Sequence, residues 1–378
     1  MKKVAQVATI TTAIITGLMS NSAFAIDFSL FGDVAYSSTS EEDVDNKSFT
    51  LGQFALIAQE EIGESTSVTA EIVFEDAGQG FEVDVERFSI SKTINPLFTI
   101  GMGRFHTHLG FWNQNFHHGS LIQDTITRPF FLEFEDTHGG IFPNHIIGFQ
   151  VSGESEQWSY QLSLSNSNGL DTSLADGNSD TALQVMNSTD PNEDKSTVFR
   201  LAYKPKTFLD EIGFSAMTNH VVEVGENDGT NSPFVNFGET LFEQQIIGVD
   251  LRLATEKFYV LAEFFQTSID DNQLINASVA NPAITSNPKT YDSTAYYAQF
   301  GYHLTSRLTA VGRFESLDYD NNSTYFKTLN VLTEERVIFA INYKLQESNA
   351  MRIQVSEADL EGGKSNTAYS LQWFFLLF

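Results

Sequence analysis

The strongest constraint in this sequence is a two-residue alternation of apolar with polar or small side chains, which recurs along most of the chain. In the segment 158–165, for example, Trp158, Tyr160, Leu162 and Leu164 alternate with three serines and a glutamine. Apolar residues spaced three and four apart, which would indicate amphipathic helices, are not evident. A period of two is typical of β-strands that have one apolar and one polar face. The sequence therefore predicts an all-β protein.

The alternation predicts sixteen strands, at residues 26–37, 48–61, 66–77, 81–92, 96–104, 143–153, 157–166, 196–206, 211–224, 240–255, 257–268, 291–304, 306–319, 327–344, 349–358 and 365–378. Every second connection is short, at 63–65, 95–96, 154–157, 256, 305 and 347–348, whereas the others include long polar stretches at 167–195, 225–239 and 269–290. A transmembrane barrel has short turns on one rim and long loops on the other, and a soluble β-sandwich has no reason to show this pattern. We therefore predict a transmembrane antiparallel β-barrel of about sixteen strands.

Hydropathy and composition favour a barrel over a helical membrane protein. Outside residues 1–25, no window approaches the roughly 18 uninterrupted apolar residues that a spanning helix needs. Aromatic residues make up 13% of the chain, yet its mean hydropathy is −0.16, because polar residues alternate with the apolar ones. The sequence has no cysteine, so closure of the sheet, and not a disulfide framework, has to hold an exported chain together.

The first 25 residues have the pattern of a cleaved secretory signal peptide. Two lysines follow Met1, a largely apolar and uncharged stretch comes next, and Ala23-Phe24-Ala25 forms an A-x-A cleavage site. The alternative is an N-terminal transmembrane helix, but polar residues interrupt the stretch too often for one. We therefore expect residues 1–25 to be removed and residues 26–378 to form the barrel domain.

The predicted mature chain is strongly acidic. Lys2 and Lys3 are the only charged residues of the first 25, which leaves 19 basic and 49 acidic residues, a net charge of −30, in residues 26–378. Nucleic-acid binding needs a basic surface, so nucleic acid is not expected as a partner. The acidity favours cations at the surface and in an aqueous lumen.

Charged residues within the strands are expected to face the lumen, because a charge on the lipid face costs about 2–4 kcal/mol at the bilayer midplane. By the alternation, the inward basic residues are Arg200, Lys204, Arg252, Arg313 and Arg352. The inward acidic residues are Glu71, Glu75, Asp250, Glu263 and Glu315. Opposite charges across a narrow pore set up a transverse field that orders permeating solutes, although some of these residues are expected only to pair between neighbouring strands.

Arg104 breaks this pattern, because its parity matches that of apolar Met102 and points it toward lipid. We expect either a β-bulge at Gly101 or Gly103 that turns Arg104 inward, or a position of Arg104 above the bilayer.

A second change of parity separates the apolar residues Val83 and Val85 from Phe88 and Ile90. This change predicts another bulge, near Glu86.

The carboxyl end resembles that of Gram-negative outer-membrane barrels, which typically finish on an amphipathic strand with a terminal Phe. Three residues match the final alternation of such a strand: Phe374, Leu376 and Phe378. Upstream, the apolar parity changes to Leu371 and Trp373, with Gln372 where another apolar residue would be usual. The resemblance implies a location in the cell outer membrane, contact with its lipid, and recognition of this end by the barrel-assembly machinery.

The longest connection, residues 105–142, lies between the fifth and sixth predicted strands, and long loops of this kind are usually functional. Four short motifs lie in or beside it: Gly103-Arg104-Phe105, His117-His118-Gly119, Arg128-Pro129 and Gly139-Gly140. With the strand order, these motifs resemble a porin-like subfamily of outer-membrane proteins of unknown substrate. The resemblance implies that this third outer loop folds into the lumen and narrows it, and that the barrel belongs to a class that commonly trimerises.

The predicted constriction combines charged residues of this loop with the wall arginines. The loop residues are His117, His118, Arg128, Glu133, Glu135 and Asp136, and the wall residues are Arg200, Arg252, Arg313 and Arg352.

Six of the eight histidines lie in or beside the loop: His106, His108, His117, His118, His138 and His145. Neutral imidazole and carboxylate are suitable ligands for zinc or a similar divalent ion. The candidate ligands are His106, His108, His117 and His118, although their spacing is not a recognised metal signature. The alternative is that the histidines pack the loop against the wall through hydrogen bonds.

We expect a passive channel for small hydrophilic solutes that favours cations and needs no cofactor. The first alternative is a channel or binding protein for a divalent metal ion or its chelate, which would use the loop histidines. Outer-membrane barrel hydrolases are a second alternative, but the sequence contains neither a G-x-S-x-G nor an H-E-x-x-H motif, so we do not expect an enzyme. A structural or adhesive barrel is a third.

Overall fold

The computed structural model describes residues 26–41, 44–76, 80–117, 122–134, 140–171, 182–185, 190, 192–205, 207, 209–224, 238–272, 289–329, 331, 333–360 and 362–377. The predicted signal peptide, residues 1–25, lies outside the described residues and remains a prediction. Side chains at residues 41, 44–46, 75, 76 and 81 are also outside this description.

The described residues form the strands β1 (Asp27–Glu41), β2 (Val44–Ile62), β3 (Thr66–Asp76), β4 (Phe81–Asn95), β5 (Phe98–His106), β6 (His145–Glu154), β7 (Trp158–Asn166), β8 (Asn168–Leu170), β9 (Leu183–Val185), β10 (Lys195–Tyr203), β11 (Leu209–Glu223), β12 (Thr240–Ala254), β13 (Phe258–Asp271), β14 (Lys289–Thr305), β15 (Leu308–Tyr319), β16 (Thr333–Gln346), β17 (Asn349–Leu360) and β18 (Lys364–Leu377). Helical structure is limited to α2 (Trp112–Asn115), the 3-10 turn η1 (Phe130–Leu132) and α4 (Thr324–Thr328) in this part of the chain.

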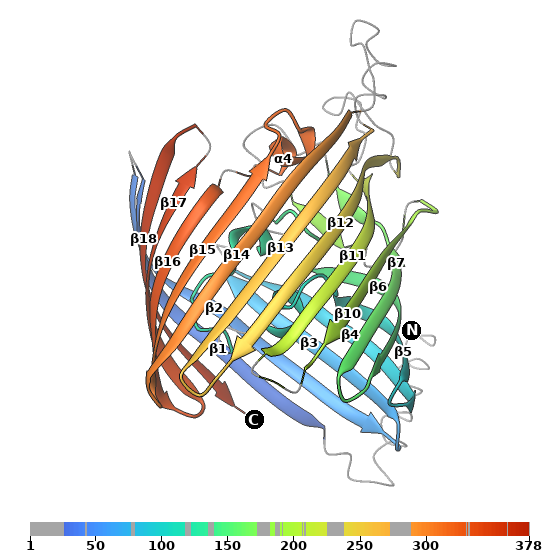
Figure 1. Cartoon of the computed structure of the whole chain (residues 1–378), viewed down its shortest axis with the longest axis horizontal. Helices are drawn as coiled ribbons and strands as arrows, with labels where there is room; N and C mark the ends of the chain where they lie inside the picture. Colours follow the sequence, from blue (N-terminus) through green and yellow to red (C-terminus); the bar gives the residue numbers. More distant parts are fainter. Residues whose placement is uncertain are drawn as a thin grey trace, which may run out of the picture.

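Sixteen of these strands form one closed antiparallel barrel (Figure 1). Each strand of the ring pairs with the next one along the chain, except that β7 pairs with β10. The ring closes where β1 pairs with β18, from Leu30 opposite Leu377 to Ser40 opposite Thr367. The short β8 and β9 are additional, because β8 pairs with β9 and lies parallel to β11. The prediction of an all-β barrel with about sixteen strands is therefore confirmed.

No helix among the described residues has the length and apolar character needed to span a membrane.

The two-residue alternation of the sequence becomes an outward and an inward face of the wall. On β12, Ile247 and Val249 face outward and are 51% and 47% exposed, whereas Gln244 and Asp250 face inward and are buried. The same separation holds on β14, where Phe300 is outward and Gln299 is inward. An apolar exterior and a polar interior are the arrangement of a barrel that stands in lipid.

The predicted short turns agree with the structure, whereas two predicted segments differ: β8 and β9 form within the predicted connection 167–195, and a helix forms before β16. Turns at one rim are short, since β2 ends at Ile62 and β3 begins at Thr66, and β14 ends at Thr305 and β15 begins at Leu308. The prediction that a strand begins at residue 327 is wrong, because Thr324–Thr328 forms α4 and β16 begins only at Thr333. Phe326 and Leu329 in this region are buried in the apolar interior, which favours a helical turn that packs on the loops.

The bulge predicted near Glu86 is confirmed. Glu71 pairs with Arg87 and the next residue, Ile72, pairs with Val85, so Glu86 is an extra residue in β4. The bulge turns Glu86 into the interior, where it is buried.

The explanation expected for Arg104 is only partly right. The register of β5 with β4 and with β6 continues without a shift through Gly101 and Gly103, so there is no bulge at either glycine. Instead, Gly103 has a φ of +138°, and this backbone rotation brings Arg104 to a buried position with its Nη2 3.3 Å from the carboxylate of Asp84.

The expected change of parity in the last strand is wrong. Outward positions continue without a break along β18, through Tyr369, Leu371, Trp373, Phe375 and Leu377. Phe374 points inward, where the Arg352 guanidinium lies 4.0 Å above its ring, and Leu376 packs on the buried Phe31 cluster. Gln372 is therefore an ordinary inward residue, and Phe378 lies outside the described residues.

The backbone at Gly103 gives a test of the barrel's stability. A Cβ on Gly103 would overlap the carbonyl oxygen of Phe88, and its φ of +138° is strained for any other residue. We expect Gly103→Ala to lower the free energy of unfolding by about 1–3 kcal/mol or more, measured as a lower urea midpoint of tryptophan fluorescence in the refolded barrel.

Gly312→Ala is the matched control, because a Cβ there would meet the Phe339 ring at an ordinary distance of 3.8 Å. Its free energy of unfolding should change by less than about 0.5 kcal/mol. Equal midpoints for the two variants would show that Gly103 carries no special backbone constraint.

Candidate functional site

The connection between β5 and β6, which contains α2 and η1, runs along the inner wall of the barrel (Figure 1). Its backbone amides donate to inward side chains of β13, β15 and β17: Trp112 N to Glu263 Oε1 (2.6 Å), Phe130 N to Glu315 Oε2 (2.8 Å) and Ile126 N to Gln354 Oε1 (2.8 Å). These contacts agree with the expectation that the loop folds into the lumen.

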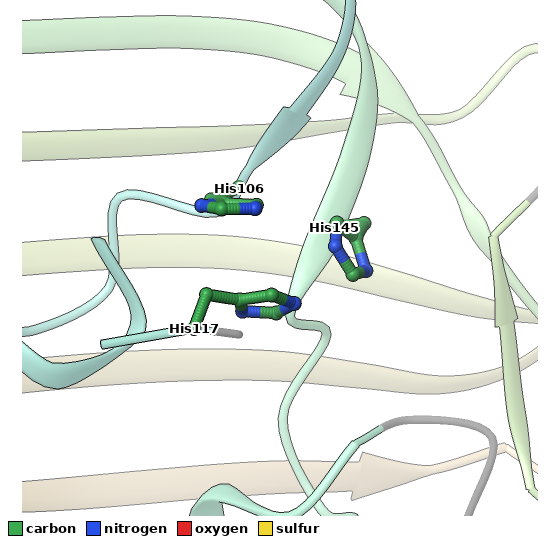
Figure 2. A group of neighbouring side chains, drawn as sticks. All are labelled: His106, His117 and His145. Carbon is green, nitrogen blue, oxygen red and sulfur yellow. The ribbon is translucent and has the colours of Figure 1, made fainter. Parts of the chain in front are cut away.

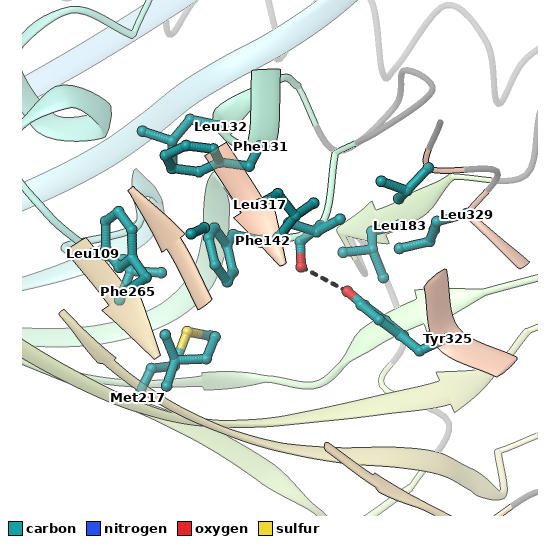
Figure 3. Close-up of a cluster of buried hydrophobic side chains, with 14 of the residues drawn as sticks. Leu109, Phe131, Leu132, Phe142, Leu183, Met217, Phe265, Leu317, Tyr325 and Leu329 are labelled. Carbon is teal, nitrogen blue, oxygen red and sulfur yellow. Dashed lines mark hydrogen bonds between the residues drawn. The ribbon is translucent and has the colours of Figure 1, made fainter. Parts of the chain in front are cut away.

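An apolar cluster fills the space between this loop and one side of the wall (Figure 3). Leu109, Phe131 and Phe142 of the loop pack with Phe265 of β13 and Met217 of β11, all of them buried. Burial of each such side chain contributes about 1.5–3 kcal/mol, so the apolar contacts supply much of the attachment.

The helix α4 closes this cluster near the long loops. Tyr325 of α4 is fully buried, and its hydroxyl donates to the carbonyl oxygen of Ile141 at 2.7 Å (Figure 3).

Two wall arginines hold the backbone of the loop. Arg313 donates through Nη2 to the carbonyl oxygens of Thr127 (2.8 Å) and Arg128 (2.9 Å), and its Nε lies 2.6 Å from Glu315. Arg336 donates to the same Arg128 carbonyl and contacts the other oxygen of Glu315 at 3.0 Å. Loop carbonyls that have no strand partner are satisfied in this way.

Arg128 braces the loop from within, because its guanidinium donates to the carbonyl oxygens of Leu132 and His117, both at 2.7 Å. The wall residue Arg313 points inward, as predicted, but the loop covers it. Arg313 thus anchors the loop and does not line an open passage.

The other three predicted wall arginines, Arg352, Arg200 and Arg252, each have a different environment. Arg352 is fully buried between Gln372 and the ring of Phe374, so it too is covered and does not face open lumen. Arg200 is paired with Glu211 (2.7 Å) and Asp250 (2.6 Å).

Arg252 is about half exposed, and its guanidinium carbon lies 5.7 Å from the ring centre of the loop residue Phe111. Of the predicted inward acidic residues, Glu71, Asp250, Glu263 and Glu315 are buried in the interior, and the side chain of Glu75 is outside the description.

Two cavities lie beside the loop inside the barrel. The first, of about 530 Å³, is lined by Gln114 of the loop and, on the wall, by polar residues that include Ser152, Gln161, Arg200 and Lys204. The second, of about 460 Å³, lies between the loop and β1, β2 and β18, with Asp33, Gln53, Arg128, Glu133 and Gln372 in its lining. Arg128 and Glu133 are thus members of the predicted constriction that do line a cavity, whereas His118, Glu135 and Asp136 lie outside the described residues.

His108 does not join a metal cluster. Its Nε2 is 2.9 Å from Gln150 Oε1 and its Nδ1 is 2.7 Å from Gln114 Nε2, so both ring nitrogens have glutamine partners. Burial lowers the pKa of the His108 imidazole to about 4, so the ring is neutral near pH 7. His108 thus packs the loop against the wall through hydrogen bonds, which is the alternative to metal binding that the sequence left open.

Three other histidines meet at the start and end of the loop (Figure 2). His106 is the last residue of β5, His145 is the first residue of β6, and His117 follows α2. Each offers a ring nitrogen, and these atoms lie within 4.8 Å of one another. The carboxylate of Glu86, from the β4 bulge, lies 2.6 Å from His145 Nε2 and 3.9 Å from His117 Nε2.

The structure brings together two of the four candidate ligands from the sequence, His106 and His117, with His145 and Glu86 beside them. His108 is engaged elsewhere, and His118 is outside the described residues, so the predicted metal site stays a prediction. The signal for His145 was present, because the two ends of a loop between adjacent antiparallel strands face each other, and His106 pairs with His145.

Comparisons with known proteins agree with this architecture. A family model described as phosphate-selective porin O and P matches residues 24–327. Similar solved structures include an anion-selective porin from Comamonas acidovorans (TM-score 0.61, 10% identity, 93% of this chain and 99% of that chain) and the outer membrane channel DcaP of Acinetobacter baumannii (0.60, 8%, 93% and 97%). The trimer form of OmpT, an outer membrane protein of Vibrio cholerae, is also similar (0.58, 10%, 94% and 100%). A comparison with curated proteins gave no match.

Removal of the Arg313 side-chain charge should release the loop. Arg313→Gln loses the charged donor to two loop carbonyls and to Glu315, and loss of one partner from a buried ion pair costs about 3–5 kcal/mol. We expect chymotrypsin to cleave the folded variant after Phe130, Phe131 or Phe134 and to leave the parent protein intact there, as seen by mass spectrometry of the fragments.

Arg252→Gln is the matched control, because Arg252 is half exposed and lies 3.9 Å from its acidic partner Asp210. It should be as resistant as the parent protein. Equal resistance of Arg313→Gln would mean that the apolar cluster alone holds the loop.

Proposed function

Because this chain belongs to the family of phosphate-selective porins O and P, we propose that it is a passive channel for small hydrophilic solutes. The protein is an outer-membrane β-barrel, and its family and fold are those of solute channels. No covalent chemistry is needed for this role, since a porin lowers the barrier for diffusion by supplying polar surface across the apolar layer.

The observation that carries the proposal is the uneven filling of the barrel. The folded loop is bound to β13, β15 and β17, and its apolar cluster includes wall residues from β5 to β15, while polar cavities remain next to the loop on other parts of the wall. The serine, glutamine and paired charged side chains of the 530 Å³ cavity can replace the hydration of a small polar solute.

We propose a weak preference for cations. Four arginines of the interior, Arg128, Arg313, Arg336 and Arg352, are occupied by loop carbonyls or covered, so they offer a passing anion few free donors. In the first cavity, Arg200 and Lys204 are offset by Glu211 and Glu154, and the net charge of the whole chain is −28. The phosphate selectivity in the family description is thus not carried over to this chain.

The assembly of the barrel is also a proposal. The similar OmpT structure is a trimer form, and we propose that this chain also forms a homotrimer. Recognition of the carboxyl end, with Phe374, Leu376 and Phe378, by the barrel-assembly machinery likewise remains a proposal.

Conductance of single barrels tests the channel. The refolded protein, inserted in planar bilayers, should give stepwise increases in current, and under a KCl gradient its reversal potential should have the sign of a cation-selective pore. Full insertion without conductance would contradict the channel, and a reversal potential of the opposite sign would contradict the cation preference alone.

A charge reversal in the first cavity should move the selectivity. Lys204→Glu removes the partner of Glu154 (2.6 Å) and adds a third carboxylate to this lining, beside Glu154 and Glu211, so the reversal potential should shift further to the cation side. Lys257→Glu, in the turn between β12 and β13, has the same charge change at a residue that lines neither cavity, and should leave the reversal potential nearly unchanged. Equal shifts for both variants would show that the cavity is not on the ion path.

A further inference from the structure

We propose that His106, His117 and His145, with Glu86, bind a divalent transition-metal ion, with zinc the ion best suited to the donor set, and that this ion fastens the loop to the wall. Three imidazoles and one carboxylate are a common ligand combination for zinc, which accepts four ligands in a tetrahedron.

The four residues come from four separate segments that the barrel brings together. His106 and His145 are opposite each other in the ladder of β5 and β6, which fixes the distance between them. Glu86 reaches them because the bulge in β4 turns it inward. His117 approaches from the loop, and its ring stacks on that of His106 with the ring centres 4.0 Å apart (Figure 2).

The distances are close to those of a tetrahedral site. With bonds of about 2.0–2.1 Å, ligand atoms around zinc lie about 3.4 Å from one another. The imidazole nitrogens lie within 4.8 Å, and Glu86 Oε2 is 3.9 Å from His117 Nε2 and 2.6 Å from His145 Nε2. Side-chain rotations that move these atoms by about an ångström would complete the tetrahedron.

The hydrogen bonds around His117 prepare its Nε2 for a metal. The amide nitrogen of Asn113 donates to the carbonyl oxygens of Thr107 and Asn144, both at 2.9 Å, so the oxygen of Asn113 must face the ring of His117. That oxygen is 2.6 Å from His117 Nδ1, which therefore carries the proton as donor. In a neutral ring the lone pair is then on Nε2, the nitrogen that lies toward Glu86, and an outer partner of this kind is typical of metal-binding histidines.

The charged groups next to the three histidines have other partners, so Glu86 would supply the negative charge of the metal site. Glu71, which is 3.9 Å from His106 Nε2, is bound by Arg87 at 2.5 Å. Arg104 Nη2 is 3.9 Å from the Glu86 carboxylate and 3.3 Å from that of Asp84, and Arg104 Nε donates to the backbone carbonyl of Glu86 at 3.1 Å. His117, His145 and Glu86 are almost fully buried, so a bound ion would be largely shielded from water.

A metal at this place would join the loop to three wall strands. His117 precedes the loop segment that Arg313 and Arg336 hold, whereas Glu86, His106 and His145 belong to β4, β5 and β6 on the other side of the loop. The ion would thus fix the loop to β4, β5 and β6, opposite the strands from which Arg313 and Arg336 hold it.

The test is calorimetric titration of the refolded, chelator-treated full-length barrel with ZnCl₂. We expect one zinc ion per chain, loss of this binding in His117→Ala, and an affinity about 10- to 100-fold lower in Asn113→Ala, which removes the outer partner of His117, together with its hydrogen bonds to the Thr107 and Asn144 carbonyls, but none of the four ligands. His303→Ala, which removes a histidine of β14 that faces Thr309, should bind as the parent protein does.

Two results would overturn the proposal: no zinc uptake by the folded parent protein, or equal affinity in the parent and His117→Ala. Because a loop variant can fail to fold, a second measurement uses the parent protein with Co²⁺. A tetrahedral site gives strong visible absorption that zinc displaces, whereas only the weak spectrum of hydrated Co²⁺ would contradict the site.

The metal site and the proposed channel can fail separately. A barrel that binds zinc and does not conduct would support the site and contradict the channel, and a conducting barrel that takes up no zinc would do the reverse. Zinc should also slow chymotrypsin cleavage after Phe130, Phe131 or Phe134 in Arg313→Gln, while addition of zinc to the doubly substituted Arg313→Gln, His117→Ala protein should have no effect.

Discussion

The structure depends on one constraint: a backbone in lipid has no water with which to pair its amide and carbonyl groups, so a sheet that crosses the membrane must have no open edge. The ladder between β1 and β18 meets this requirement, because it joins the first and last strands over eleven consecutive positions. Closure then decides which side chains meet lipid. On β12, Ile247 and Val249 face outward, and Gln244 and Asp250 face inward. This alternation suits a closed wall that has lipid on its outer face and a polar interior.

A ring of sixteen strands encloses more space than its own inward side chains can fill, and the loop between β5 and β6 occupies part of that space. A loop inside a barrel brings carbonyl oxygens that no ladder can satisfy. Here guanidinium groups satisfy them, and the Glu315 carboxylate pairs with both Arg313 and Arg336. Arg313 and Arg336 are thus better understood as structural donors to the loop than as a charged lining.

Much of the fold could be predicted from the sequence, since a period of two and the alternating lengths of connections are local properties. The bulge at Glu86 was also visible, because a break in parity has few other physical causes. The last strand shows the limit: both faces near its end are apolar, Phe374 and Leu376 as well as Phe375 and Leu377, so parity alone could not show which face meets lipid. Pairing with Arg352 and with the Phe31 cluster decides it, and these contacts are distant in sequence.

The candidate site was harder to predict for the same reason. That His106 and His145 face each other follows from antiparallel pairing, but the hydrogen bonds that engage His108 with Gln150 and Gln114 depend on the path of the loop. That path also has a consequence for the order of assembly. Several groups that hold the loop come from the last quarter of the chain, as Arg313 is 185 residues beyond Arg128 and Gln354 is 228 residues beyond Ile126. Those contacts of the loop can form only once β15 and β17 have taken their places, so the loop is fully fixed only after these C-terminal strands have joined the wall.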